Sequence, residues 1–234
     1  MIFPKVKGCK FYLVGGCVRD TVMKKPFNDY DYVVETLLSF GDLVKTINEM
    51  PNSRVYLEKK EFLTIRSKIN GLDCDIAYPR KDSNYSDGRH PDKVDHVGSL
   101  KEDASRRDFT ANALYMDESG KIYDFFGGLK DIKNNILRAV GDPRKRFKED
   151  YLRILRGIRF AIQLGFEIET KTKLEMSLAH VGLCQISTER IMKEMNKCFH
   201  IDARATLSMV EKFNLWEVIK YHELNFNLNN KKVK

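Results

Sequence analysis

Apolar residues follow two different spacings along the chain, and the change comes near residue 140. Before that point, short apolar runs alternate with amphipathic stretches, which is typical of strands and helices in turn. The pattern predicts helices from about residue 18, over residues 37–50 and over residues 102–116. It predicts strands at residues 11–14, 31–35, 54–57, 62–69, 72–77, 121–126 and 136–140.

Beyond residue 140, apolar residues recur only at helical spacing. Asp142 and Pro143 indicate a helix start, because Asp caps a helix and Pro is tolerated in its first turn. A single helix up to residue 165 is predicted by Phe147, Tyr151, Leu155, Ile158 and Ile162. Further helices are predicted from about residues 170, 187 and 202.

The chain is therefore predicted to be an α+β protein. A mixed head is expected over residues 1–140, an all-helical neck and short body over residues 141–226, and a polar, basic tail over residues 227–234. Residues 79–100 are mostly polar and predict a long loop. A loop of that length inside a compact domain is usually functional.

Composition narrows the class of protein. No apolar run approaches the length that crosses a bilayer, and the N-terminus lacks the pattern of a signal peptide, so a cytoplasmic location is expected. The five cysteines are scattered without a Cys-x-x-Cys pair, which argues against a zinc site or a disulfide framework. The net charge of +8 suits an acidic partner such as nucleic acid.

Two glycines lie where a predicted strand passes into a predicted helix. Gly15 and Gly16 let the backbone approach a ligand, and the start of the helix presents free N–H groups to an anion. Arg19 adds a guanidinium that can bind phosphate. Taken alone, two glycines before a helix more often form only a tight turn that binds nothing.

Asp29 and Asp31 lie two residues apart, so a strand presents both carboxylates on one side. Their mutual repulsion disfavours this arrangement in a purely structural role. Mg²⁺ prefers carboxylates together with water and substrate phosphates, so the pair suits a magnesium site. A solvated strand start at a sheet edge is the alternative, and an isolated pair of this kind favours it. Asp75 is a candidate third carboxylate, because Cys74 and Ile76 beside it are expected to face the core.

The sequences GGCVRD and NDYDYVV resemble the opening motif of the polymerase-beta superfamily, in the branch of class II tRNA nucleotidyltransferases and bacterial poly(A) polymerases. The resemblance implies a polymerase-beta-like nucleotidyltransferase head, a small mixed sheet with helices, followed by a helical neck. It also implies that Asp29 and Asp31 hold two Mg²⁺ ions and that Arg19 lies on the triphosphate side of the nucleotide. Asp29, Asp31 and Asp75 are then the catalytic candidates.

Residues 106–113, RRDFTANA, resemble a second motif of this family. On the predicted helix, Asp108 and Asn112 share one face. The resemblance implies that this pair binds the ribose hydroxyls, and that Arg106 or Arg107 contacts phosphates. Residues 124–131, DFFGGLKD, resemble a third motif, to which the resemblance assigns a hinge role.

Asp150 and Arg153 lie three apart on the helix predicted up to residue 165, and they resemble the family's base-reading motif. Cytosine and adenine present an amine donor beside a ring-nitrogen acceptor, which a carboxylate and a guanidinium complement. Uracil and guanine present a carbonyl and a ring N–H there and leave buried charges unpaired. The pair therefore predicts that CTP and ATP are accepted without a template. A local helical ion pair is the structural alternative.

Further positions fit the family pattern. Arg156 and Arg159 are candidate nucleotide-binding residues. Residues 187–194, with Arg190 and Glu194, resemble the last motif, for which a structural and a functional role are both open. The candidates for RNA contact are Lys193, Lys197 and Arg204, against the alternative of a solvated helix face.

The resemblance covers residues 11–199 in five ordered motifs, and it implies addition of C and A to tRNA 3′ ends with CTP and ATP. Residues 78–91 resemble the loop of enzymes that switch from C to A addition. Residues 65–73 lack the arginine-rich strand of bacterial poly(A) polymerases. A poly(A) polymerase and an enzyme that adds only part of CCA are the alternatives within the family. A relative that binds RNA without catalysis is the third.

Overall fold

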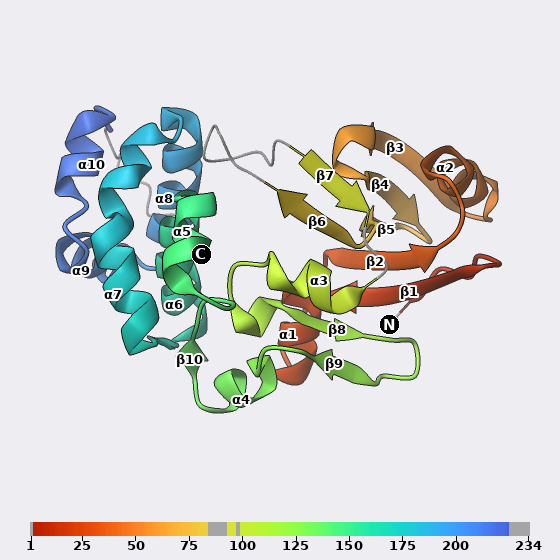
Figure 1. Cartoon of the computed structure of the whole chain (residues 1–234), viewed down its shortest axis with the longest axis horizontal. Coiled ribbons are helices and arrows are strands. Elements are labelled where there is room, and N and C mark those ends of the chain that lie inside the picture. Colours follow the sequence, from red (N-terminus) through yellow and green to blue (C-terminus); the bar gives the residue numbers. More distant parts are fainter. Residues whose placement is uncertain (1, 84–92, 97–98, 225–234) are drawn as a thin grey trace, which may run out of the picture. The chain divides into compact units, whose positions relative to one another are not determined.

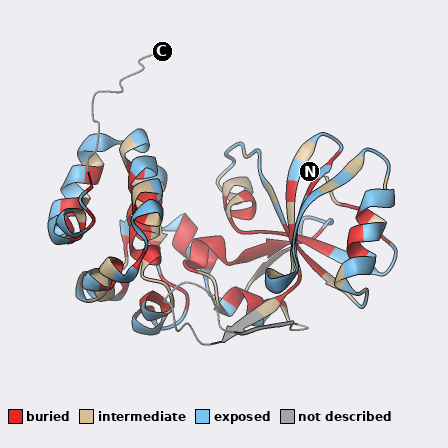
Figure 2. Ribbon diagram, turned by 90° about the horizontal axis from the view of Figure 1, so that it is seen from above, coloured by how far each residue is buried: buried red, intermediate tan, exposed pale blue. Residues whose placement is uncertain are grey.

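The computed structural model describes residues 2–83, 93–96 and 99–224. Within them the chain forms two compact units, of which unit 1 comprises residues up to 132 and unit 2 comprises residues 133–224. Buried residues, red in Figure 2, run along the strands of unit 1 and along the helices of unit 2. The predicted α+β class, with a mixed sheet followed by a helical segment, is confirmed.

Unit 1 is built on a seven-stranded sheet with the order β3-β4-β5-β2-β1-β8-β9 (Figure 1). Only β2 and β5 run parallel, and every other neighbouring pair is antiparallel. The strands are β1 (Cys9–Val14), β2 (Tyr30–Thr36), β3 (Ser53–Lys59), β4 (Thr64–Ile69), β5 (Leu72–Ala77), β8 (Leu114–Met116) and β9 (Ile122–Asp124). Residues 11–14 of β1 are buried on both faces, which explains their continuous apolar run.

Short helices complete unit 1. The α-helices are α1 (Gly16–Val22), α2 (Phe40–Glu49), α3 (Leu100–Ser105) and α4 (Gly128–Lys133), and the 3₁₀ turns are η1 (Lys60–Phe62) and η2 (Thr110–Asn112). Helix α2 begins after Ser39, whose Oγ accepts a hydrogen bond from the backbone N–H of Asp42 at 3.2 Å. Its buried face includes Leu43 and Ile47. Helix α1 packs against β1, β8 and η2, so the Gly15–Gly16 turn adjoins the centre of the sheet.

The predicted loop over residues 79–100 is wrong in part. β6 (Arg80–Ser83) and β7 (Lys93–His96) form an antiparallel pair, and α3 begins at Leu100. A two-stranded ribbon is held by backbone hydrogen bonds, so a polar sequence forms it without the apolar alternation that reveals a strand. Residues 84–92 and 97–98 of this loop lie outside the described residues, as do residues 227–234 of the predicted tail.

The helix predicted over residues 102–116 is also wrong beyond residue 105. Helix α3 ends at Ser105, Phe109 is extended with φ −126° and ψ 148°, and residues 114–116 form β8. Strand β8 pairs with β1 on one side and β9 on the other. Its three residues are at most 2% exposed, so tertiary pairing and burial override the helical spacing.

Unit 2 is mainly helical. Its elements are α5 (Pro143–Glu149), α6 (Leu152–Leu164), α7 (Thr170–Ala179), η3 (His180–Gln185), α8 (Thr188–Ile201), α9 (Ala203–Lys212) and α10 (Trp216–Tyr221), with β10 (Ile136–Leu137) parallel to β11 (Glu167–Ile168). The two-residue β11 corrects the prediction that strands end near residue 140. Within the described residues, no helix has both the length and the apolar character of a membrane span.

The single helix predicted up to residue 165 is interrupted at Asp150. This residue adopts φ −153° and ψ 104°, which ends α5, and α6 starts two residues later. The Asp150 side chain accepts a hydrogen bond from the backbone N–H of Leu152 at 3.0 Å. Aspartate favours such local contacts over a helical interior, which accounts for the break.

Gly128 provides a test of the contact between α4 and η2 in unit 1. A Cβ at this position would lie 2.3 Å from the carbonyl oxygen of Thr110, so Gly128→Ala must displace α4 or η2. We expect the substitution to lower the free energy of unfolding by about 1–3 kcal/mol, measured by urea denaturation. Gly41→Ala is the matched control, because no atom lies within 4 Å of a Cβ there and α2 favours alanine. Equal effects of the two substitutions would contradict the close contact.

Candidate functional site

A row of charged side chains crosses three strands of unit 1. Asp31 on β2 lies opposite Asp75 on β5, and Asp75 lies opposite Arg66 on β4. Opposite residues on neighbouring strands point to the same face, so the two carboxylates and the guanidinium share one side of the sheet. Arg66 Nη2 lies 3.2 Å from Asp75 Oδ2. Asp29 precedes Asp31 by two residues, just before β2 begins.

The carboxylates in this row disfavour each other's ionisation. Burial among protein atoms, followed by the negative charge of Asp75, raises the pKa of Asp31 to about 6, although its surface remains accessible to solvent. The charge of Asp29 acts in the same direction, while Arg107 and Arg66 oppose it. Burial also raises the pKa of Asp75, against the charge of Arg66. The site therefore favours a cation.

Mg²⁺ fits this donor set. Among residues 2–83, 93–96 and 99–224, no three acidic, histidine or cysteine side chains converge as a complete metal cage. A magnesium site does not need one, because Mg²⁺ is commonly held by one or two carboxylates plus water and substrate phosphates. Asp29 and Asp31 supply two carboxylates, and the negative charges of Asp75 and Asp29, which add to burial in raising the pKa of Asp31, are charges that a cation would neutralise.

The predicted phosphate and ribose motifs are joined by one buried chain of hydrogen bonds. Arg19, 4% exposed, donates from Nε and Nη2 to the carboxylate of Asp20. Its Nη1 donates to Asn112 Oδ1 at 2.7 Å. Asn112 Nδ2 in turn donates to Asp108 Oδ1 at 3.4 Å. The predicted helix is absent here, yet Asp108 and Asn112 meet, because residues 110–112 form a 3₁₀ turn.

The glycine turn is conformationally restricted. Gly15 has φ 79° and ψ −132°, which a residue with a side chain rarely adopts. A Cβ on Gly15 would lie 3.6 Å from Nη1 of Arg107, and one on Gly16 would lie 3.6 Å from Nη2 of Arg19. Two of the predicted phosphate-binding arginines therefore lie against the two glycines.

The third motif, residues 124–131, anchors the second motif, residues 106–113. Asp124 accepts hydrogen bonds from the backbone N–H groups of Gly128 and Leu129, both at 2.9 Å, and so fixes the start of α4. Asp131 on α4 accepts a hydrogen bond from Thr110 Oγ1 at 2.7 Å. These contacts hold the turn between Asp108 and Asn112 in place.

In unit 2, Asp150 and Arg153 have different partners. Asp150 Oδ2 lies 3.2 Å from Arg190 Nη2 on α8. Arg153, 9% exposed, donates from Nη1 to Glu149 Oε2 at 2.7 Å and to the carbonyl oxygen of Arg146 at 2.8 Å. The expectation that both residues share one face of a continuous helix is corrected by the break at Asp150.

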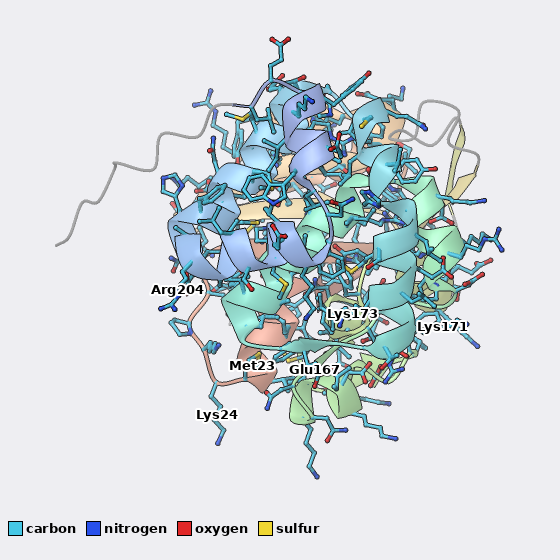
Figure 3. All side chains as sticks on the ribbon, turned by 90° about the vertical axis from the view of Figure 1, so that its left-hand side faces the viewer. Met23, Lys24, Glu167, Lys171, Lys173 and Arg204 are labelled. Carbon is cyan, nitrogen blue, oxygen red and sulfur yellow. The ribbon has the colours of Figure 1, made fainter. Side chains whose placement is uncertain are left out.

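The remaining candidates in unit 2 lie on α6, α8 and α9. Arg159 Nε is 2.7 Å from Glu194 Oε2, and Lys197 Nζ is 3.0 Å from Glu194 Oε1. Arg156 lies over the ring of Phe160, 5.4 Å from its centroid. Lys193 and Arg204 are exposed, and Arg204 is labelled on unit 2 in Figure 3. Within the described residues, the last motif thus contributes ion pairs of Arg190 with Asp150 and of Glu194 with both Arg159 and Lys197.

Sequence reasoning missed Asp103 and Glu149 as site residues. Asp103 is fully buried and binds Arg106 and Arg107, and Glu149 binds Arg153. A signal was present, because each carboxylate lies three or four residues before its arginine.

A mixed sheet with a carboxylate row beside a glycine turn, followed by a helical unit, is the fold class of polymerase-type nucleotidyltransferases. Residues 11–138, more than half of the chain, match the Poly A polymerase head domain, and the chain belongs to this family. Residues 165–224 match the family described as the probable RNA and SrmB-binding site of polymerase A.

Similar proteins are CCA-adding enzymes. That of Enterococcus faecalis is 41% identical over 191 residues, which cover 82% of this chain and 45% of the relative. The crystal structure of the Bacillus stearothermophilus CCA-adding enzyme in complex with CTP has a TM-score of 0.73 and 35% identity, over 85% of this chain and 47% of that one. A tRNA nucleotidyltransferase complexed with a primer tRNA and an incoming ATP analog has a TM-score of 0.73 and 30% identity, over 96% of this chain and 62% of that one. The chain spans about half the length of the curated relatives it matches.

The raised pKa of Asp31 predicts a pH-dependent stability in metal-free solution. Because the folded value, about 6, exceeds the ordinary 3.8, folding disfavours the ionised carboxyl. The penalty is absent where both states are protonated, grows between these two values and is constant above them. We expect Asp31→Asn to raise the free energy of unfolding above about pH 6 and to leave it unchanged near about pH 3.

Urea denaturation across pH in the presence of a chelator measures this effect. Asp73→Asn is the matched control, because Asp73 is exposed on the same strand as Asp75. A gain in stability that is the same at both pH values would contradict the electrostatic origin.

Proposed function

We propose that this chain catalyses the template-independent addition of C and A to tRNA 3′ ends, using CTP and ATP. The main support is the row of mutually destabilising carboxylates in a head of the poly(A) polymerase family. The CCA-adding relatives and the structures named for their CTP and tRNA complexes support the choice of substrates.

Asp29 and Asp31, with Asp75 beside them, are the proposed catalytic residues. Asp29 and Asp31 would hold two Mg²⁺ ions, which supply activation of the RNA 3′-hydroxyl and neutralisation of the triphosphate and pyrophosphate. Arg66 binds Asp75 and limits the negative charge of the row. Asp31 must be ionised to bind a cation, so its raised pKa predicts weaker cation binding below about pH 6.

In unit 1, the incoming nucleotide is bound by residues of the glycine turn and of the motif over residues 106–113. Gly15 and Gly16 lie beside Arg107 and Arg19 at the turn. The proposed phosphate contacts are Arg19 together with Arg106 or Arg107. Asp108 and Asn112 are the proposed ribose contacts. Their mutual hydrogen bond and the contact with Arg19 orient both side chains before the nucleotide arrives.

Asp150 and Arg153 are the proposed base-reading residues of unit 2. The donor and acceptor pattern shared by cytosine and adenine suits a carboxylate and a guanidinium, and the pattern of uracil and guanine does not. Arg190 and Glu149 hold the two side chains in fixed positions. Arg156 and Arg159 remain proposed nucleotide contacts, and Lys193, Lys197 and Arg204 remain proposed RNA contacts.

The domain assignment also stays a proposal: a catalytic head over residues 1–140, a helical neck and short body over 141–226, and a tail over 227–234. A cytoplasmic location follows from the proposed tRNA substrate and stays a prediction. The family description itself names poly(A) polymerase, which makes poly(A) addition the second candidate function.

The decisive experiment is extension of a 3′-truncated tRNA in Mg²⁺ with each nucleotide alone and then with CTP plus ATP. We expect ordered addition of C, C and A followed by a stop. Long A tails on unrelated RNA would favour poly(A) addition. Addition of only part of CCA would indicate a partial enzyme, and RNA binding without incorporation would indicate an inactive relative.

The carboxylate assignment has its own test. We expect Asp29→Ala combined with Asp31→Ala to reduce incorporation by at least about 10³-fold, because the ligands of the proposed ions are lost. Asp73→Ala, which removes an exposed carboxylate from β5, is expected to retain activity within about 2-fold. Near-normal activity of the double variant would refute the metal assignment.

A further inference from the structure

Arg107 is held rigidly from two sides inside unit 1. Its Nη2 donates to Asp103 Oδ2 at 3.0 Å, and its Nε donates to the hydroxyl of Tyr115 at 3.0 Å. The guanidinium also lies over the Tyr115 ring, 5.3 Å from its centroid. The Tyr115 hydroxyl closes the triangle by donating to the same Asp103 oxygen at 2.5 Å.

Asp103 and Tyr115 are both fully buried, at 0% exposure. The other oxygen of Asp103 accepts from Arg106 Nε at 2.9 Å, Arg106 Nη2 at 2.7 Å and the backbone N–H of Arg80 at 3.3 Å. The positive charges of the two arginines overcome burial and hold the pKa of Asp103 well below its usual range. A buried carboxylate with this many donors is a fixed anchor.

The third nitrogen of Arg107 points to the glycine turn. Nη1 lies 3.6 Å from the position a Cβ would take on Gly15, and the described residues give it no hydrogen-bond partner. The strand register explains this placement, since Tyr115 on β8 lies opposite Val14, the residue before Gly15. The charge of Arg107 also reaches the proposed catalytic carboxylate Asp31.

The charge balance leaves this nitrogen available for an anion. Asp103 carries one negative charge and contacts two arginines, so it cannot neutralise both of them. Arg106 donates two of its nitrogens to Asp103 and neutralises it. Arg107, in contrast, contacts Asp103 through one nitrogen and presents another beside the turn.

We propose that Asp103 and Tyr115 are positioning residues that aim Arg107 Nη1 at the triphosphate of the incoming nucleotide. Arg106 serves as the internal counter-charge of Asp103. The proposal rests on the proposed nucleotidyltransferase function and assigns different roles to two adjacent arginines that the motif does not distinguish. The ligand chemistry at Nη1 is a polyphosphate, from a nucleoside triphosphate or from released pyrophosphate.

Tyr115→Phe tests the positioning role by removing one hydroxyl while retaining the ring. A flexible Arg107 binds polyphosphate less well, so we expect KM for both CTP and ATP to rise about 3- to 10-fold, with kcat changed less than about 2-fold. Inhibition by inorganic pyrophosphate should weaken by the same factor. A purely structural role of the hydroxyl would lower the amount of active enzyme and leave KM unchanged.

Tyr123→Phe is the matched control. Tyr123 lies opposite Tyr115 on β9, and its hydroxyl donates to Asp117 at 2.9 Å, away from Arg107. We expect its KM values and its pyrophosphate inhibition to equal those of the unchanged protein. Equal behaviour of the two tyrosine variants, or a fall in kcat alone for Tyr115→Phe, would overturn the proposal.

Calorimetric titration with inorganic pyrophosphate separates this proposal from the proposed function, because it needs no turnover. Weaker binding to Tyr115→Phe than to the unchanged protein supports positioning of Arg107, even if no RNA is extended. Equal binding to both, or no binding to the unchanged protein, overturns it. Failure to extend any RNA while pyrophosphate binding behaves as expected refutes only the proposed function.

Discussion

The register between the parallel strands β2 and β5 is the constraint on which the candidate site depends. It places Asp31 opposite Asp75, two like charges, and it also places Tyr32 opposite Ile76, both buried. A shift by one residue would separate the carboxylates but turn the buried side chains toward the opposite face. The hydrophobic core therefore imposes the repulsion, which acts together with burial, the larger cause, to raise the pKa of Asp31. Arg66 and Arg107 offset part of it, and a cation can offset the rest.

Around the carboxylate row, buried hydrogen bonds restrict the movement of long polar side chains that are usually mobile. Arg19 is bound by Asp20 and Asn112, and Arg107 is bound by Asp103 and Tyr115. Ordering an arginine costs side-chain entropy, and here folding supplies that cost before any ligand binds. Such preorganisation is what recognition of a flexible triphosphate requires.

The sequence predicted those features that depend on neighbouring residues. Alternation over residues 72–77 correctly predicted that Cys74 and Ile76 are buried. It failed over residues 114–116, because pairing with β1 and β9 decides their conformation and is not local. The helix break at Asp150 could have been predicted from the sequence, since aspartate favours helix caps over helix interiors. The contact of Asp150 with Arg190, 40 residues away, could not.

In unit 2, two ion pairs of opposite polarity, each with one partner on α8, fix how α8 lies against the segment around Asp150. Asp150 contacts Arg190, and further along α6, Arg159 contacts Glu194. Arg190 and Glu194 are four residues apart on α8, about one helical turn. Sliding α8 by one turn would bring Glu194 toward Asp150 and pair two carboxylates, so only one register satisfies both contacts. The orientation of Asp150 therefore depends on α8, a helix that begins only at Thr188. Because that helix supplies Arg190, the last motif holds in place the carboxylate that we propose reads the base.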